Sequence, residues 1–203
     1  MEAQQKWPSK LYKFKSFAQP QQIIDIFENS HIYCSKFQEL NDPMEGVFVH
    51  YGLKNCIVDE LYKAKNKRLI ACFTTCIQNE AMWAYYADSA RGIAIEIENN
   101  FDNSKSNYVN YQSNISEINQ IIHNYLIDVN PILFNKLSSF SHENEFRVIN
   151  KVQDSLKPDN RFINVKISKV FYTNRITQSN KKFLEKLSKL YEIKIEEHKH
   201  LKL

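Results

Sequence analysis

The chain has 203 residues, of which 43% are hydrophobic and 25% are charged, with a formal net charge of +4. These fractions are near the averages for globular proteins and exclude a disordered or fibrous chain, and the length suits one domain spanning 1–203. The apolar runs fall far short of the about 20 residues that span a bilayer. Residues 1–15 lack the apolar stretch of a secretory signal, so we expect a cytoplasmic protein with no membrane partner.

Cysteine and glycine usage exclude several common sites. The four cysteines, Cys34, Cys56, Cys72 and Cys76, include no C-x-x-C pair. We therefore expect buried free thiols rather than disulfides, and we expect no metal. With only three glycines, the chain has neither a G-x-G-x-x-G turn nor a P-loop, which excludes Rossmann dinucleotide binding and Walker-type phosphoryl transfer.

Basic residues gather at the C-terminal end. Residues 157–203 hold 12 Lys and Arg against 5 Asp and Glu, a net +7 that leaves −3 for the rest of the chain. Such a segment can face nucleic acid. The interpretation that we favour is a solvated helix surface, with Lys181, Lys182, Lys186 and Lys189 opposite the apolar Phe183, Leu184, Leu187 and Leu190.

The predicted elements alternate irregularly along the chain. Strands are predicted at 11–17, 32–34, 69–75, 93–97, 109–111, 146–149, 162–167, 170–172 and 193–196. Helices are predicted from Pro20, over 47–65, over 80–87 with Asn79 as cap, over 115–136 with Pro131 as a kink or break, and over 180–191. A shaped polar loop is predicted at 38–46. This order predicts an α+β fold with a mixed, mainly antiparallel sheet flanked by helices.

The first candidate site is Glu143-Asn144-Glu145-Phe146-Arg147. In a strand, residues 143, 145 and 147 lie on one face, about 7 Å apart in succession. Three charges on one strand face rarely belong in a core. Either one carboxylate binds a substrate that the other carboxylate or Arg147 orients, or glutamate and arginine simply pair on an exposed strand.

Two further motifs carry unusual residues. The turn at Asn41-Asp42-Pro43 presents Asn41, Asp42 and Glu45 together, although an Asx turn alone explains the pattern. Met82-Trp83-Ala84-Tyr85-Tyr86 offers aromatic rings that can stack on a nicotinamide or a base. Core packing accounts for most of these side chains whatever their further role.

These motifs occur in an order that resembles a bacterial family catalogued as domain of unknown function 2971. The resemblance covers about residues 11–175. It rests on five segments: Leu11-Tyr12-Lys13-Phe14-Lys15-Ser16-Phe17; Leu40-Asn41-Asp42-Pro43-Met44-Glu45; Ala71-Cys72-Phe73-Thr74; Met82-Trp83-Ala84-Tyr85-Tyr86-Ala87 with Gly92-Ile93-Ala94-Ile95; and Glu143-Asn144-Glu145-Phe146-Arg147. The family itself implies no settled activity.

The layout is also similar to that of ADP-ribosyltransferases. That resemblance implies an enzyme that consumes NAD, as a transferase or a glycohydrolase, in phage defence or toxin-like regulation. It implies Glu145 as the carboxylate that stabilises an oxocarbenium ion, with Glu143 directed to a nucleic-acid or protein acceptor. The residues implied to bind NAD are Tyr12, Lys13, Asn41, Asp42, Trp83, Tyr85, Tyr86 and Arg147.

Two other classes of function stay open at this point. A non-catalytic module that binds nucleic acid or protein is supported by the basic C-terminal part. A metal-dependent nuclease is a further alternative, because Asp42, Glu45, Glu143 and Glu145 are carboxylates that can bind hard cations.

Overall fold

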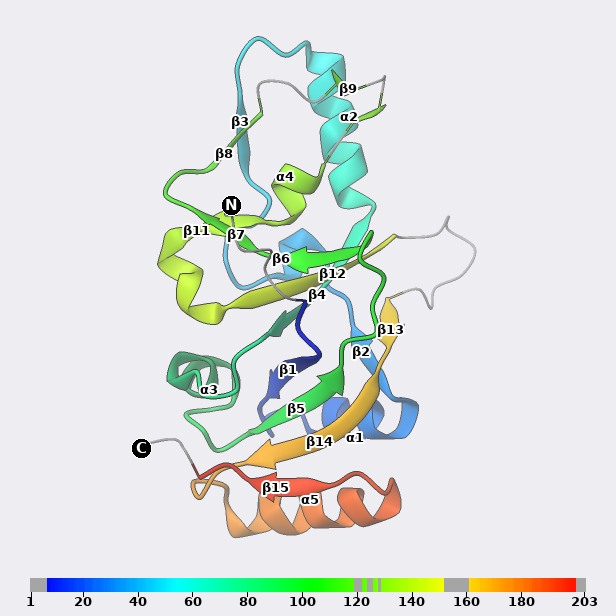
Figure 1. Cartoon of the computed structure of the whole chain (residues 1–203), viewed down its shortest axis with the longest axis vertical. Coiled ribbons are helices and arrows are strands. Elements are labelled where there is room, and N and C mark those ends of the chain that lie inside the picture. The colour runs from blue at the N-terminus through cyan, green and yellow to red at the C-terminus, as the bar shows by residue number, and fades with distance from the viewer. Residues whose placement is uncertain (1–6, 119–121, 124–125, 128, 152–160, 200–203) are drawn as a thin grey trace. The chain divides into compact units, whose positions relative to one another are not determined.

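A computed structural model of the chain describes residues 7–118, 122–123, 126–127, 129–151 and 161–199 (Figure 1). Helices and strands mix along the sequence, and the strands pair in both directions. The predicted α+β class with a mixed sheet is therefore confirmed. The residues group into two compact units: unit 1 is 1–32, 73–101 and 164–203, and unit 2 is 33–72 and 102–163. The single-domain interpretation of 1–203 stays a prediction.

Unit 1 is built on a sheet with the strand order β15-β14-β5-β1. Its strands are β1 (Lys10–Lys15), β5 (Ile93–Glu98), β14 (Lys166–Tyr172) and β15 (Ile195–Glu197), and its helices are α1 (Pro20–Asn29), α3 (Glu80–Tyr86) and α5 (Gln178–Leu190). Strands β2 (His31–Tyr33), β4 (Arg68–Thr74) and β13 (Phe162–Asn164) have residues in both units. The β14–β15 pair is parallel, whereas β5 pairs antiparallel with both β1 and β14.

The register gives the unit 1 sheet two different faces. Tyr12 pairs with Glu96 and Phe14 with Ala94, so these four side chains share one face, where Phe14 and Ala94 pack with Trp83 of α3. Leu11, Ile95, Ile97 and Ile167 belong to the other face. A pocket lined by Ile167 together with Phe27 of α1 and Tyr191 after α5 places the ends of those two helices on that second face.

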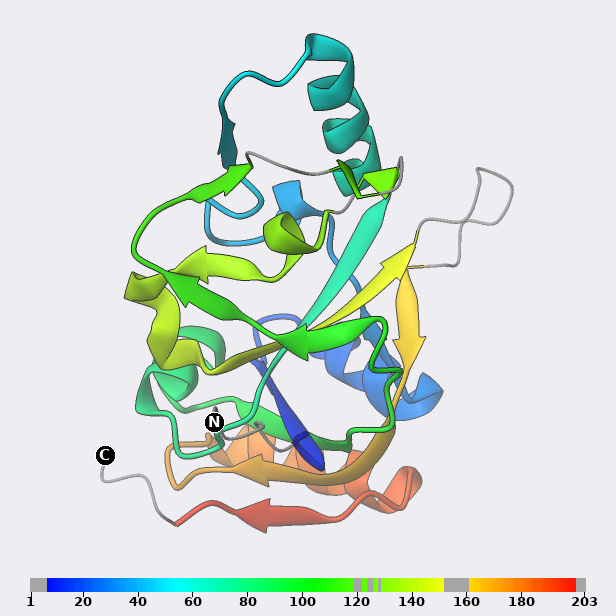
Figure 2. The same ribbon diagram turned by 45° about the horizontal axis from the view of Figure 1, so that its top comes forward.

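The helices of unit 1 begin and end where the sequence supplies the required groups. Pro20 stands in the first turn of α1, and Ser30 closes that helix in the left-handed conformation. Asn79 caps α3 through a bond that its Oδ1 accepts from the Met82 amide at 3.2 Å, which confirms the predicted cap. Thr177 caps α5 in the same way. This last helix lies alongside β15 in both views (Figure 1, Figure 2).

Unit 2 combines short strands and short helices. Part of its backbone forms a sheet with the order β4-β12-β6, where β12 is Glu145–Lys151 and β6 is Ser106–Tyr108. Two parallel pairs join β11 (Asn135–Leu137) to β7 (Asn110–Gln112) and β3 (Phe48–His50) to β8 (Ser116–Ile118). The other elements are β9 (Ile122–His123), β10 (Leu126–Ile127), α2 (Asn55–Asn66), α4 (Asn130–Leu133) and the 3₁₀ helices η1 (Phe37–Glu39) and η2 (Ser138–Glu143). Phe37, Leu61 and Ile132 are among the residues of its apolar core.

Two predicted helices are wrong in this unit. The segment 47–65 forms β3 and then α2, because the β-branched and aromatic Val47-Phe48-Val49 suits a strand and Gly52, at φ +70°, turns the chain between them. The segment 115–136 forms β8, β9, β10, α4 and most of β11, with Pro131 in the first turn of α4 rather than at a kink. Residues 119–121, 124–125 and 128 of that segment lie outside the described residues.

The four cysteines, which all lie within the described residues, form no disulfide with one another. Cys34 is buried as predicted, but Cys56 on α2 is exposed, so the prediction of a buried thiol is wrong there. Among the described residues, no helix has both the length and the apolar character needed to cross a bilayer.

Candidate functional site

Five charged side chains meet inside unit 2: Glu45, Lys136, Glu143, Glu145 and Arg147. The most exposed of them, Lys136 and Glu143, have only 7% of their side-chain surface accessible, and Arg147 has none. Three carboxylates and two cations leave a formal charge of −1 in the cluster. Charges buried to this degree are stable only when they are paired and hydrogen-bonded.

Arg147 holds the cluster together from β12. Its Nε and Nη2 donate to the two carboxylate oxygens of Glu145 at 2.7 and 3.0 Å, and Nη2 also donates to Oε1 of Glu45 at 2.6 Å. Its Nη1 donates to the Leu133 carbonyl at 2.7 Å. The forked contact with Glu145 is the geometry in which a guanidinium binds a carboxylate most strongly.

Lys136 is the second cation, and it contacts all three glutamates. Its Nζ lies 2.7 Å from Oε2 of Glu143, 3.1 Å from Oε1 of Glu45 and 3.3 Å from Oε2 of Glu145. The ammonium also lies 4.7 Å from the centre of the Phe140 ring. Oε2 of Glu45 is buried and has no hydrogen-bond partner in the described part of the chain.

The pairing controls protonation within the cluster. Burial alone would raise the pKa of Glu145, but the Arg147 guanidinium and the Lys136 ammonium outweigh burial and lower that pKa to about 2. In the same way, although burial works against the charged forms of Arg147 and Lys136, the neighbouring glutamates raise the pKa of both. All three groups therefore stay charged at neutral pH.

The local backbone explains how these side chains converge. Lys136 of β11 pairs in register with Tyr111 of β7, whose hydroxyl accepts a hydrogen bond from the Glu145 amide at 2.8 Å. Burial raises the pKa of Tyr111 to about 12. Glu143 ends η2, and Asn144 follows at φ 46°, so the prediction that residues 143, 145 and 147 share one strand is wrong at Glu143.

The predicted turn at Asn41–Glu45 reaches the same cluster through one residue. The Glu45 amide donates to the Asp42 carbonyl at 3.1 Å, which closes the turn. The turn places the Glu45 carboxylate in contact with Arg147. Asp42 is buried, and its Oδ1 accepts a hydrogen bond from the Met44 amide at 2.8 Å, as in an Asx turn, while Asn41 is exposed. No group of three or more His, Cys, Asp or Glu among the described residues is arranged to hold a metal ion.

The aromatic residues of the predicted site lie in unit 1, and they differ in how much of their surface is exposed. Trp83 is completely buried; its Nε1 donates to the Ile77 carbonyl at 2.7 Å, and its ring stacks on His198. Tyr86 packs against the same apolar core, whereas 75% of the Tyr85 surface is exposed. Tyr85 is therefore the ring of this helix that a ligand can reach most readily.

Tyr12 and Lys13 lie on opposite faces of the unit 1 sheet. The Tyr12 hydroxyl donates to the buried Glu96 at 3.1 Å, and Glu96 also accepts bonds from Lys10 at 2.8 Å and Ser168 at 2.9 Å. Burial, with the Glu96 carboxylate beside it, raises the pKa of Tyr12 to about 12. The Lys13 ammonium lies 6.0 Å from the centre of the Phe73 ring.

Sequence reasoning therefore found part of each charge cluster. Glu143, Glu145 and Arg147 do come together, but Lys136 was missed because it fell at the end of a predicted helix. Glu96 was also missed, although a single glutamate inside the apolar run Ile93–Ile97 is a detectable signal of a paired buried charge.

A basic surface on α5 contrasts with these paired charges. Lys182, Lys186 and Lys189 are exposed and recur at the spacing of one helix face, opposite the buried Leu184 and Leu187. None of these three lysines has an ion-pair partner in the part of the chain that the structure describes. Lysines elsewhere in unit 1 do have partners: Lys10 with Glu96, Lys166 with Glu98 and Lys169 with Glu196.

Comparison with protein-family models, with curated proteins and with solved structures gave no match. The resemblances to domain of unknown function 2971 and to ADP-ribosyltransferases stay predictions.

Proposed function

We propose that this chain is a binding protein whose α5 surface takes up nucleic acid. The observation that carries the proposal is the row of exposed Lys182, Lys186 and Lys189, which have no ion-pair partner among the described residues, whereas Lys10, Lys166 and Lys169 of the unit 1 sheet pair with glutamates. Seven residues of helix place the first and last ammonium groups about 10 Å apart. Phosphates are spaced closely enough along a strand for the row to contact two or three of them.

The buried cluster supports a binding function rather than a catalytic one. A carboxylate that stabilises an oxocarbenium ion must contact the ribose. Glu145 is 4% exposed, and both of its oxygens accept hydrogen bonds from Arg147. Its carboxylate is already paired with both Arg147 and Lys136, so we treat it as a structural partner in this arrangement. NAD turnover by Glu145 and Glu143 stays a prediction, which the NAD assay of Glu145→Gln described below tests.

The test is binding of labelled single-stranded RNA and duplex DNA, measured by fluorescence anisotropy at several salt concentrations. We expect micromolar or weaker binding with no sequence preference, and a slope of log affinity against log salt of about −2 to −3. Replacing Lys182, Lys186 and Lys189 with Gln should remove most of that slope. The matched control replaces Lys63, Lys105 and Lys166, which are exposed and lie beside carboxylates, and should retain the slope.

Two outcomes would overturn the proposal. One is a wild-type protein that binds neither nucleic acid. The other is an equal loss of binding in the two triple variants, since both change the net charge by the same amount. Hydrolysis of NAD by the wild type, lost in Glu145→Gln at an unchanged melting temperature, would instead support the transferase interpretation.

A further inference from the structure

Exposed apolar side chains are concentrated in one segment of unit 2. Eight large hydrophobic residues are exposed in the described part of the chain, and four of them lie within 44–51: Met44 at 38%, Val47 at 39%, Val49 at 36% and Tyr51 at 68%. The largest apolar patch on a soluble protein is often a binding surface. This segment, which includes β3, is therefore a candidate contact surface.

Strand β3 gives these side chains a common face. Phe48 packs in the apolar core of unit 2, so Val47 and Val49 on either side of it point to the opposite face. The parallel register pairs Val49 with Glu117 of β8, which lies beside β3 (Figure 1). Because residues that pair across a sheet share a face, the outer face of the β3–β8 pair carries Val47, Val49 and Glu117.

This outer face is left open to solvent. Parallel strands occur almost only in sheets whose two faces are both covered. The inner face of the β3–β8 pair is covered, because Phe48 and Ile118 are buried in the core, whereas Val49 and Glu117 are exposed. The pair is therefore a half-covered parallel sheet, and a helix is the element that usually covers such a face.

A hollow of about 710 Å³ borders this face and supplies polar contacts. Ile115, Glu117, Pro131 and Asn135 are among the residues that line it, with the turn at 112–114. Of the lining residues, Glu117 alone carries a charge, and it has no ion pair within the ranges that the structure describes. A basic side chain placed in the hollow therefore meets a carboxylate with amide and hydroxyl groups around it.

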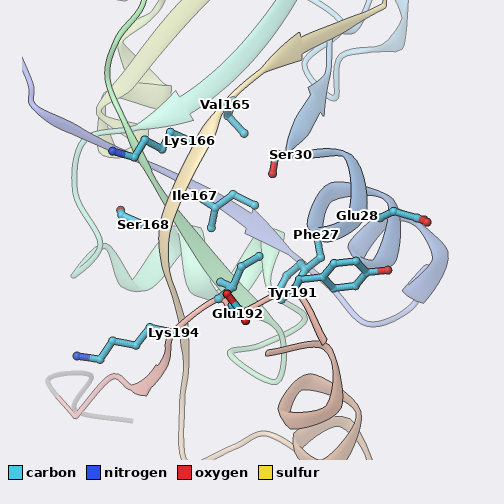
Figure 3. A pocket seen from close by; sticks show the side chains of 11 residues that line it. Phe27, Glu28, Ser30, Val165, Lys166, Ile167, Ser168, Tyr191, Glu192 and Lys194 are labelled. Carbon is cyan, nitrogen blue, oxygen red and sulfur yellow. The ribbon is translucent and has the colours of Figure 1, made fainter. Parts of the chain in front are cut away.

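The hollow beside α1 and α5 in unit 1 is of a different kind (Figure 3). Phe27 in its lining is only 2% exposed, so it offers little apolar surface to a partner. Lys166 and Lys194 line that hollow together with two glutamates, so both signs of charge are present. The β3–β8 face, by contrast, combines exposed apolar side chains with a single sign of charge.

The dimensions of the β3–β8 face suit one helix. Paired strands lie about 4.8 Å apart, so two strands cover a width of about 10 Å, which is the diameter of a helix. The extended chain from Val47 to Tyr51 spans about 13 Å, the length of about nine helical residues. Its apolar side chains present a few hundred Å², whereas each partner in a stable protein–protein interface buries about 800 Å². The face is therefore too small for a stable dimer and fits a short helical segment.

We propose that the outer face of the β3–β8 pair binds an amphipathic helix of a partner protein, with apolar residues at every third or fourth position and a basic flank. The apolar residues of that helix pack on Val47, Val49 and Tyr51, and a Lys or Arg beside them reaches Glu117 in the hollow. The proposal does not depend on nucleic-acid binding by α5, because α5 belongs to unit 1 and this face to unit 2.

The test uses fluorescence anisotropy and three labelled, alanine-rich peptides of about 16 residues, long enough to form a helix. The first has Leu at helical spacing and Lys beside the row of Leu. The second has Glu in place of Lys, and the third has the composition of the first with its Leu residues spread around the helix. We expect micromolar or weaker binding of the first peptide alone, because the second repels Glu117 and the third has no continuous apolar face. Equal binding of the second or the third peptide would overturn the proposal.

A pair of double variants separates this face from general hydrophobic attraction. Val49→Ser with Tyr51→Ser should weaken binding of the first peptide about tenfold. Tyr85→Ser with Leu190→Ser removes two exposed apolar side chains of unit 1 and should leave binding unchanged. If melting curves show that the first double variant does not fold, Glu117→Gln changes one exposed side chain and should still weaken binding several-fold. Equal affinities of the matched variants, or an unchanged affinity in Glu117→Gln, would sink the assignment to this face.

The oligomeric state tests whether a second copy of the chain occupies the face instead. Sedimentation should give the same mass for the wild type and for Val49→Ser with Tyr51→Ser, because the face is too small to hold a dimer. A wild-type dimer that this double variant dissociates would assign the face to a second copy and overturn the helical partner.

Discussion

Arg147 and Glu45 occupy opposite positions in the charge balance of the unit 2 cluster. Arg147 compensates two carboxylates, whereas Glu45 supplies the surplus negative charge and leaves Oε2 without a partner among the described residues. The sequence indicated that charges at 143, 145 and 147 are too many for a core. They lie in the core nevertheless, because Lys136 and Glu45 compensate them. Glu45 is 102 residues away from Arg147, and local patterns carry no information on such contacts.

Substitutions at these two residues should therefore differ in cost. Arg147→Met leaves three carboxylates with one ammonium, and we expect a loss of about 3–5 kcal/mol in the free energy of unfolding. Glu45→Gln makes the cluster formally neutral and keeps an acceptor for Arg147, so the loss should stay below about 1 kcal/mol. Urea denaturation measures both, with the exposed Glu117→Gln as a control. Equal losses in the two variants would show that the balance of charge does not determine stability.

At the scale of elements, the predictions are accurate where a helix-start signal precedes a run of apolar residues at helical spacing. Pro20 and Asn79 begin α1 and α3 at the expected residues. The local sequence predicts helices over 47–65 and over 115–136. Pairing of Phe48–His50 with Ser116–Ile118 stabilises strands in both segments instead. Strand pairing between distant segments therefore overrides the local preference for a helix.

Gly92, at the start of β5, carries an element-scale prediction. A Cβ at this position would lie 2.2 Å from the Lys15 carbonyl oxygen and 3.0 Å from Cα of Ala87. Both neighbours are backbone, so Gly92→Ala must displace β1 or the end of α3, and we expect a loss of about 3 kcal/mol in stability. Gly52→Ala meets no atom within 4 Å and carries only the strain of φ +70°, about 1 kcal/mol. Thermal melts of both variants check the difference, and a Gly92→Ala melt no lower than that of Gly52→Ala would contradict it.

At the scale of the whole molecule, each unit buries a glutamate that stays ionised through its donors. In unit 1, burial alone would raise the pKa of Glu96, but hydrogen bonds from Lys10, Ser168 and Tyr12 lower it. In unit 2, Arg147 and Lys136 lower the pKa of Glu145 to about 2. The composition, with its small net charge, predicts neither site. The basic C-terminal part was visible in the sequence, but the structure was needed to separate the paired lysines of β14 from the unpaired ones of α5.

These two glutamates set the expected response of the whole protein to acid. A carboxyl group whose pKa is lower in the folded than in the unfolded chain contributes stability above its unfolded value, near 4.5 here, and loses it as pH falls toward the folded value. The free energy of unfolding should therefore fall between pH 4.5 and 2, by up to about 1.4 kcal/mol per pH unit for each group. Glu145→Gln should start less stable at pH 7 and show a shallower acid slope, and Glu96→Gln should do the same if Glu145→Gln does not fold. Urea melts from pH 7 to pH 2 measure the slope. A slope unchanged in both variants would mean that neither buried glutamate controls acid unfolding.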